Sequence, residues 1–136
     1  MEIVIKEAEA RVPVTIMQLH GELDASNYLD LIARAKEICA AGTRHLLLDL
    51  SGLSFMASSG LVALHSIALI TRGDEPPDPE YGWSAFRAIR KDVEGDFEQH
   101  CKILNPQPSV DRVLEVAGFK VSLEVHTDLE TALASF

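Results

Sequence analysis

The apolar run His45-Leu46-Leu47-Leu48-Asp49-Leu50 constrains the fold of this chain more than any other segment. It is too short for an independent helix and is bounded by polar and glycine residues. Its nearly continuous hydrophobicity is therefore typical of a strand that is covered on both faces. We predict that residues 45–50 form the central strand of a sheet.

Strand and helix patterns alternate on both sides of this run. An opening β-hairpin is expected from the β-branched residues of 3–5 and 14–19, because Arg11-Val12-Pro13 breaks the pattern between them. Strands that alternate with helices predict an α/β fold with a mixed sheet of mainly parallel pairs. The other expected elements are helices over 25–41, 61–71, 109–116 and 127–135, and strands over 101–104 and 121–125.

The expected helices carry more detailed predictions. Gly21-Glu22-Leu23-Asp24 should form the loop before the first helix, which ends at Gly42. The closing helix should begin with a capping box made by Thr127 and Glu130. Spacings of three and four residues predict that the buried face of the helix over 25–41 holds Leu29, Ile32, Ala33, Lys36, and Cys39 or Ala40.

The length of 136 residues predicts a single domain, residues 1–136, with an insertion at about 73–98. The first part of the insertion contains a glycine and three prolines, which is typical of a turn-rich segment. Its second part spaces Trp83, Phe86, Ile89 or Arg90, Val93 and Phe97 at three to four residues, as an amphipathic helix would. We expect the insertion to lie at the periphery of the core.

Charge and composition exclude several functions. The formal net charge of −9 opposes binding to phosphate backbones and to anionic lipid headgroups, and makes basic partners easier to accommodate. The most apolar segment, residues 61–70, is about half of the roughly 20 residues that a membrane span requires. The N-terminus lacks an export signal, which predicts a cytoplasmic location. Cys39 and Cys101 are expected to be buried, reduced thiols.

The sequence offers little support for catalysis, metals or cofactors. Its five histidines show no spacing typical of metal ligands, and no glycine-rich phosphate-binding motif occurs. We therefore expect no cofactor and no enzymatic activity, with a small hydrolase or nucleotide-binding protein as the least favoured alternative. Asp49, at the end of the central strand, can equally bond the backbone of residues 51–53.

Two segments carry a resemblance to a known family. The Gly-Glu-Leu-Asp loop at 21–24 and the stretch Leu53-Ser54-Phe55-Met56-Ala57-Ser58-Ser59-Gly60-Leu61 resemble the STAS family, and bacterial single-domain anti-sigma factor antagonists in particular. The resemblance covers Ile3 to about Arg72 and Cys101 to Phe136. It implies a mixed sheet of about five strands with helices packed mainly on one face.

The resemblance also implies a function. In that family, an anti-sigma factor kinase phosphorylates a serine or threonine at the start of the second helix, and a phosphatase removes the phosphate. The unmodified antagonist binds the kinase and thereby frees a sigma factor. The acceptor position falls on Ser58, and the preceding residue, usually Asp in the family, is Ala57. The chain would then bind an anti-sigma factor or related serine kinase.

Each candidate site residue also has a purely structural interpretation. Ser58 or Ser59 can serve as a helix cap, and Asp24 can shape a docking surface or cap the helix that follows it. Val62 and Leu69 share a helical face with Ser58 and can belong either to a partner interface or to the core. A STAS-like scaffold without a phosphorylation switch, in a larger signalling or transport complex, is the alternative function.

The expected position of the insertion can be tested by replacing residues 73–97 with a short Gly/Ser linker. Because lengthening or shortening a surface connection changes the free energy of unfolding only slightly, the variant should unfold cooperatively. Thermal unfolding followed by circular dichroism measures this. An unfolded variant at room temperature would show that Trp83, Phe86 and Phe97 belong to the core.

Overall fold

The computed structural model describes residues 1–74 and 99–136. Most of the expected insertion, including its amphipathic helix, therefore lies outside the described residues. Within the described part, no helix is long and apolar enough to cross a membrane. The elements are β1 (Glu2–Glu9), β2 (Pro13–Leu23), α1 (Tyr28–Ala40), β3 (Leu46–Met56), α2 (Ser58–Arg72), β4 (Cys101–Leu104), α4 (Pro108–Val116), the 3₁₀ helix η2 (Phe119–Val121), β5 (Val125–His126) and α5 (Leu129–Ala134).

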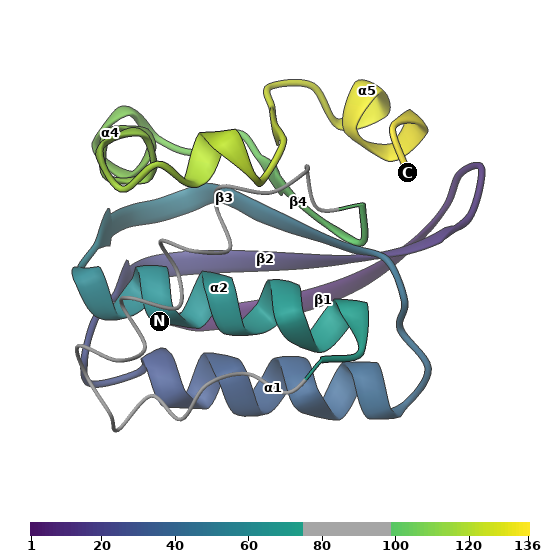
Figure 1. Ribbon diagram of the computed structural model, residues 1–136, viewed down its shortest axis with the longest axis horizontal. Coiled ribbons are helices and arrows are strands. Elements are labelled where there is room, and N and C mark those ends of the chain that lie inside the picture. The colour runs from purple at the N-terminus through teal and green to yellow at the C-terminus, as the bar shows by residue number, and fades with distance from the viewer. Residues whose placement is uncertain (75–98) are drawn as a thin grey trace.

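The five strands form one sheet in the order β1-β2-β3-β4-β5. β1 and β2 form an antiparallel hairpin, whereas the pairs β2–β3, β3–β4 and β4–β5 are parallel. β3 lies in the middle of the sheet, with α1 and α2 on one side and α5 on the other (Figure 1). The prediction of an α/β fold with a mixed sheet, and with residues 45–50 near its centre, is confirmed.

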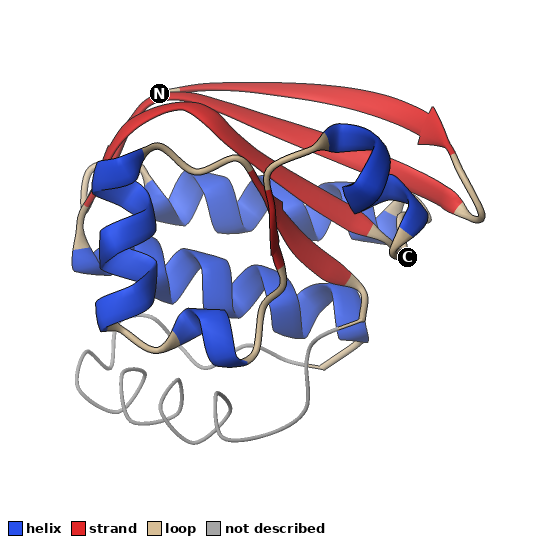
Figure 2. Ribbon diagram, turned by 90° about the horizontal axis from the view of Figure 1, so that it is seen from above, coloured by secondary structure: helices blue, strands red, loops and turns tan. Residues whose placement is uncertain are grey.

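The leucines of β3 belong alternately to two hydrophobic clusters, because successive side chains of a strand point to opposite faces. Leu46, Leu48 and Leu50 are fully buried in the larger cluster, which also contains side chains of α1, α2 and α4. Leu47 is fully buried in the smaller cluster, beneath Ala132 of α5. Among the α-helices of the described residues, α1, α2 and α4 thus pack on one face and α5 on the other, with α5 in front of the sheet in Figure 2.

The carboxyl-terminal parts of β2 and β3 differ from the sequence prediction. Residues 21–23 were expected in a loop and 51–56 in a connection, yet both segments are strand and pair up to Leu23 opposite Met56. Two irregularities in the register accompany this pairing. Exposed Ser51 and Ser54 interrupt the apolar pattern here, so the sequence indicated a loop.

The predicted buried face of the first helix was wrong. α1 begins at Tyr28 and buries Leu31, Ile32 and Ala35, whereas Leu29, Ala33 and Lys36 are exposed. Of the residues predicted for the buried face, only Ile32 is buried. Two sets of residues at spacings of three and four run along this helix, one through Leu29 and one through Leu31. The packing of α1 against α2 buries the set that contains Leu31.

The C-terminal segment also differs from the prediction. Residues 119–121 form a 3₁₀ helix after Gly118, whose φ of 80° suits glycine, so the strand is confined to Val125–His126. α5 begins at Leu129 and is capped by Asp128, whose carboxylate accepts a hydrogen bond from the Thr131 N–H at 2.9 Å. The cap predicted from Thr127 and Glu130 is therefore wrong.

Candidate functional site

Three helices begin at one edge of the sheet, because β2, β3 and β4 are parallel and each is followed by a helix. We call this region, formed by residues 21–30, 51–60 and 105–109, the carboxyl edge. The starts of α1 and α2 and the end of β3 lie together on the left of Figure 1. The Ala57 N–H donates to the Leu23 carbonyl at 2.9 Å, which joins the ends of β2 and β3.

Side-chain hydrogen bonds attach the start of α4 to the same edge. The Gln107 amide Nε2 donates to the Ser51 carbonyl at 2.8 Å, and the Ser109 hydroxyl donates to the Ser54 carbonyl at 3.0 Å. The Ser54 hydroxyl in turn donates to the Gly21 carbonyl at 3.0 Å. These bonds satisfy backbone carbonyls where the regular ladder is interrupted, and they hold the three helix starts in fixed positions.

Ser58 is the first residue of α2 and is exposed. The N-cap is Ala57, whose methyl group cannot accept a hydrogen bond, so neither serine caps the helix and the capping interpretation of Ser58 and Ser59 is wrong. Among the described residues, the Ser58 hydroxyl has no hydrogen-bond partner in the structure. Its oxygen is therefore available to another molecule.

Ser59 lies in a different environment from Ser58. Ser59 is partly exposed as a whole, but its Oγ is buried and has no hydrogen-bond partner in the described part of the chain. A partner approaching the carboxyl edge can reach the Ser58 oxygen but not the Ser59 oxygen. The structure thus separates two adjacent serines that the sequence alone cannot distinguish by chemistry.

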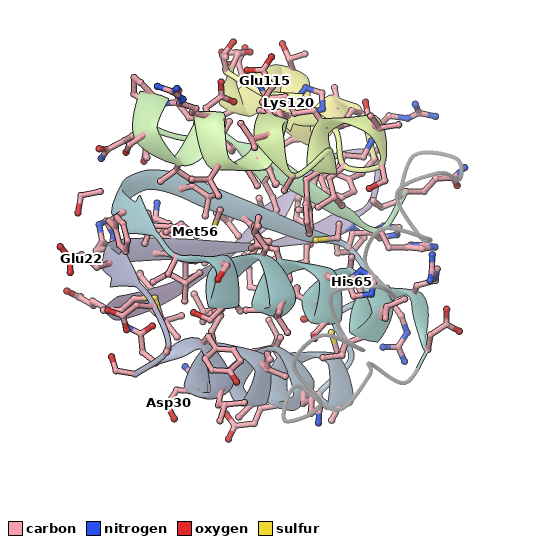
Figure 3. All side chains as sticks on the ribbon, turned by 60° about the vertical axis from the view of Figure 1, so that its left-hand side comes forward. Glu22, Asp30, Met56, His65, Glu115 and Lys120 are labelled. Atoms are coloured by element: carbon pink, nitrogen blue, oxygen red, sulfur yellow. The ribbon has the colours of Figure 1, made fainter. Side chains whose placement is uncertain are left out.

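Gly60 allows the start of α2 to lie directly on the ends of β2 and β3. A Cβ at this position would lie 2.4 Å from Met56 Cγ and 3.1 Å from two atoms of Leu23. Met56 and Leu23 are both buried, and Figure 3 shows Met56 inside the molecule while Glu22 projects outward. Close packing at Gly60 therefore fixes the position of Ser58, two residues earlier.

Asp24 organises the loop between β2 and α1. Its carboxylate accepts hydrogen bonds from both the N–H (2.9 Å) and the hydroxyl of Ser26, and these bonds hold its pKa below the ordinary value of 3.8. Asn27, the N-cap of α1, accepts from the Asp24 N–H at 3.0 Å and donates to the Glu22 carbonyl at 2.8 Å. Asp24 shapes this loop and does not cap α1.

Val62 and Leu69 do not reach the surface. Val62 is 9% exposed and belongs to the larger core cluster, and Leu69 is 7% exposed. The exposed apolar side chains of the carboxyl edge are instead Phe55 and Leu29, each 47% exposed. Sequence reasoning missed both, although the register irregularity that follows Gly21 turns Phe55 outward at the end of β3.

Asp49, the two cysteines and the possible metal ligands give no further candidate site in the described residues. The Asp49 carboxylate accepts hydrogen bonds from the Ser51 N–H at 3.0 Å and from Gln18 Nε2 at 3.3 Å, as expected for a carboxylate that supports the following backbone. Cys101 is buried and Cys39 is partly exposed, and burial raises the pKa of the Cys39 thiol. Within residues 1–74 and 99–136, no three potential metal ligands are grouped.

A cleft of about 520 Å³ lies beside β5, and the sequence analysis selected none of its residues as a candidate site residue. Lys120 and Asp111 form an ion pair of 2.7 Å across it, and the hydrogen bond to Asp111 raises the pKa of Lys120. The positive charge in this cleft is therefore already neutralised by a carboxylate. The cleft is lined by Pro106, Asp111, Lys120, Glu124, Val125, His126 and Thr127.

Residues 6–72 match the model of the STAS domain. Among solved structures, an anti-sigma factor antagonist from Mycobacterium paratuberculosis has a TM-score of 0.67 and 17% identity, covering 98% of this chain and 92% of that one. A candidate anti-sigma factor antagonist from Thermotoga maritima has a TM-score of 0.69 and 16% identity, covering 96% of this chain and 90% of that one. The Bacillus protein SpoIIAA in its phosphorylated form has a TM-score of 0.53 and 19% identity, covering 96% of each chain.

These likenesses show the fold over almost the whole chain and confirm the predicted STAS resemblance. No curated protein sequence matches the chain.

The packing at Gly60 predicts that Gly60→Ala destabilises the protein by up to about 2 kcal/mol. Overpacking costs about 1–3 kcal/mol, and the higher helix propensity of alanine offsets about 1 kcal/mol of this. Chemical denaturation measures the free energy of unfolding. In a Met56→Ala background the same substitution should cost less, since the clashing Cγ is gone. Equal costs in both backgrounds would contradict the proposed contact.

The hydrogen bonds of Asp24 predict a pH-dependent contribution to stability. Because its pKa is lowered in the folded state, the contribution is present above pH 3.8 and is lost as the pH falls through the folded pKa. Urea unfolding should therefore show Asp24→Asn to be less stable than the wild type at neutral pH, with a smaller difference in acid. Glu22→Gln, whose side chain accepts no hydrogen bond from a described residue, is the matched control. A difference independent of pH would contradict the assignment.

Proposed function

We propose that this protein, whose residues 6–72 match the STAS domain, is a phospho-regulated protein-binding module of the anti-sigma factor antagonist type. Its partner is an anti-sigma factor or related serine kinase, and Ser58 is the phosphoacceptor. The module acts by binding and has no catalytic activity of its own, and we place it in the cytoplasm. The observation that carries the proposal is the exposed, unbonded hydroxyl of Ser58 beside the buried hydroxyl of Ser59.

The start of α2 is suited to a phosphate. The first backbone N–H groups of a helix have no partner within it, and the helix dipole favours negative charge there. No acidic side chain occupies the first turn of α2. In the transfer, the Ser58 oxygen bonds to the γ-phosphorus of ATP, the bond to ADP breaks, and the hydroxyl proton passes to a base on the kinase. Hydrolysis by a phosphatase restores the hydroxyl.

Phosphorylation would change the charge of the carboxyl edge more than its shape. The phosphate adds about −1.5 to −2 charges at neutral pH. The Ser58 hydroxyl makes no hydrogen bond within the described part of the protein that the modification would break, so the fold can stay as it is. A partner shaped for a neutral hydroxyl must then desolvate or oppose an anion, which weakens binding.

The surroundings of Ser58 suggest the chemistry of the partner surface. Phe55 and Leu29 provide exposed apolar area at the same edge, and aromatic side chains often dominate the binding energy of interfaces. Glu22 is exposed, and Asp24 carries a carboxylate in the adjoining loop. We propose a partner surface with an apolar centre and flanking basic groups. Val62, one turn after Ser58, belongs to the larger core cluster and supports this surface from within the protein.

The proposal predicts opposite effects of two Ser58 variants. Ser58→Ala removes no capping bond, so it should change the free energy of unfolding by less than about 0.5 kcal/mol and should bind the kinase constitutively. Ser58→Asp should be as stable or more stable, since a carboxylate suits a helix start, yet bind at least about tenfold more weakly. Titration calorimetry with the candidate kinase measures affinity.

Incubation with the kinase and ATP, followed by intact mass and peptide mapping, tests the acceptor directly. Ser59→Ala is the matched control. This variant should still be phosphorylated on Ser58, because the Ser59 oxygen that it lacks is buried and is not the proposed acceptor. Phosphate on Ser59 alone would show that the acceptor is the wrong residue. Absence of phosphate together with equal affinity of both Ser58 variants would leave the STAS scaffold without a switch.

A further inference from the structure

β1 is a long edge strand with one unpaired side. It stands at the end of the strand order and pairs with β2 without interruption, from Glu2 opposite His20 to Glu9 opposite Pro13. Figure 2 shows it along the outside of the sheet, and no strand of the described part pairs with its outer side. Such an edge presents a row of unsatisfied N–H and C=O groups to any strand that can pair with it.

Few of the features that usually protect an edge strand are present in β1. The strand has eight residues, contains no proline and shows no register shift that would indicate a bulge. Its first half is Glu2-Ile3-Val4-Ile5-Lys6, in which the three central side chains are only partly buried. A partly apolar edge of this length, without a bulge, is a template for pairing with another chain.

The first half of β1 is complementary to itself. If two copies pair in antiparallel orientation with Val4 opposite Val4, then Ile3 lies opposite Ile5 and Glu2 lies opposite Lys6. Opposite charges and β-branched pairs on neighbouring strands stabilise a sheet. The twofold symmetry creates the Ile3–Ile5 pair and the Glu2–Lys6 pair twice each, so two identical strands are complementary to one another.

The faces of the sheet agree with this register. Ile3 and Ile5 both pack against the larger core cluster, so the Ile3–Ile5 pairs extend the apolar face that already carries α1 and α2. Glu2, Val4 and Lys6 alternate with them and therefore lie on the opposite face. Each charged pair consequently forms on the more open face, away from the core.

Neighbouring registers lack this match. Centring the pair on Ile5 places Val4 opposite Lys6 and Ile3 opposite Glu7, which sets apolar groups against charges. Centring it on Lys6 places two lysines face to face. Centring it on Ile3 places Glu2 opposite Val4. Only the register centred on Val4 pairs unlike charges and apolar side chains at once.

We propose that β1 is the dimerisation surface of this protein, at which it binds a second copy of itself through antiparallel pairing centred on Val4. The two five-stranded sheets join into one continuous sheet across a twofold axis. Since the axis reverses the strand direction, the carboxyl edges of the two copies point in opposite directions. The net charge of −9 on each copy opposes association at long range, and salt screens this repulsion.

A charge-swap experiment tests the dimer and its register. Sedimentation equilibrium of the chain without an N-terminal tag, at physiological salt, should show a concentration-dependent monomer–dimer equilibrium. Lys6→Glu replaces two attractive pairs with two repulsive ones and should weaken the dimer roughly tenfold or more. Glu2→Lys should act similarly, and the double variant Glu2→Lys/Lys6→Glu should restore the affinity because the charges are exchanged.

The matched control is Glu9→Lys, which alters charge on the same strand but beyond the self-paired stretch and should not weaken the dimer. A monomer at every concentration would overturn the proposal, and so would a double variant that stays as weak as the single ones. Circular dichroism checks that each variant is folded.

If a charge variant unfolds, cross-linking decides the matter. Val4→Cys in a Cys39→Ser background should give a covalent dimer with a short bismaleimide, since the two Val4 positions meet on the axis. Cys101 is buried and does not compete. Glu9→Cys in the same background should remain monomeric. Equal cross-linking of the two cysteine variants, or none at Val4, would overturn the register.

Discussion

The parallel pairing of β3 with both β2 and β4 determines where every other part of the carboxyl edge lies. Three strands that point the same way must end at the same edge, so the helices that follow them begin side by side. Bonds such as that from the Ala57 N–H to the Leu23 carbonyl then fix the distances between these starts. The position of Ser58 is a consequence of the sheet more than of its own local sequence.

Hydrophobic pattern was sufficient to predict the arrangement of the fold. The run of leucines identified β3 as the central strand because burial on both faces leaves little room for polar residues. Pattern failed where one face is open: the polar Ser51 and Ser54 made the end of β3 read as a loop. The pattern also failed in α1, where two helix faces have equally spaced candidate core residues. Only the packing of α1 against α2 determines which face is buried.

The candidate site was predictable in part for the same reasons. The resemblance assigned Ser58, and the structure adds that its oxygen is exposed while that of Ser59 is buried. The outward position of Phe55 could not be predicted, since it depends on the register irregularity between β2 and β3. The assignment of Val62 to the core depends on how α2 rotates against the sheet, which spacing along one helix does not define.

The connection between α2 and β4 leaves and re-enters the fold at the end of the sheet opposite to Ser58. α2 ends at Arg72 with its cap at Gly73, and β4 begins at Cys101, on the right of Figure 1. Because the cost of closing a surface connection depends only weakly on its length, we expect that residues added or removed between these points leave the strand register and the start of α2 unchanged. The carboxyl edge and this connection therefore lie at opposite ends of α2, so that a change in the length of one is separated from the other by the whole helix.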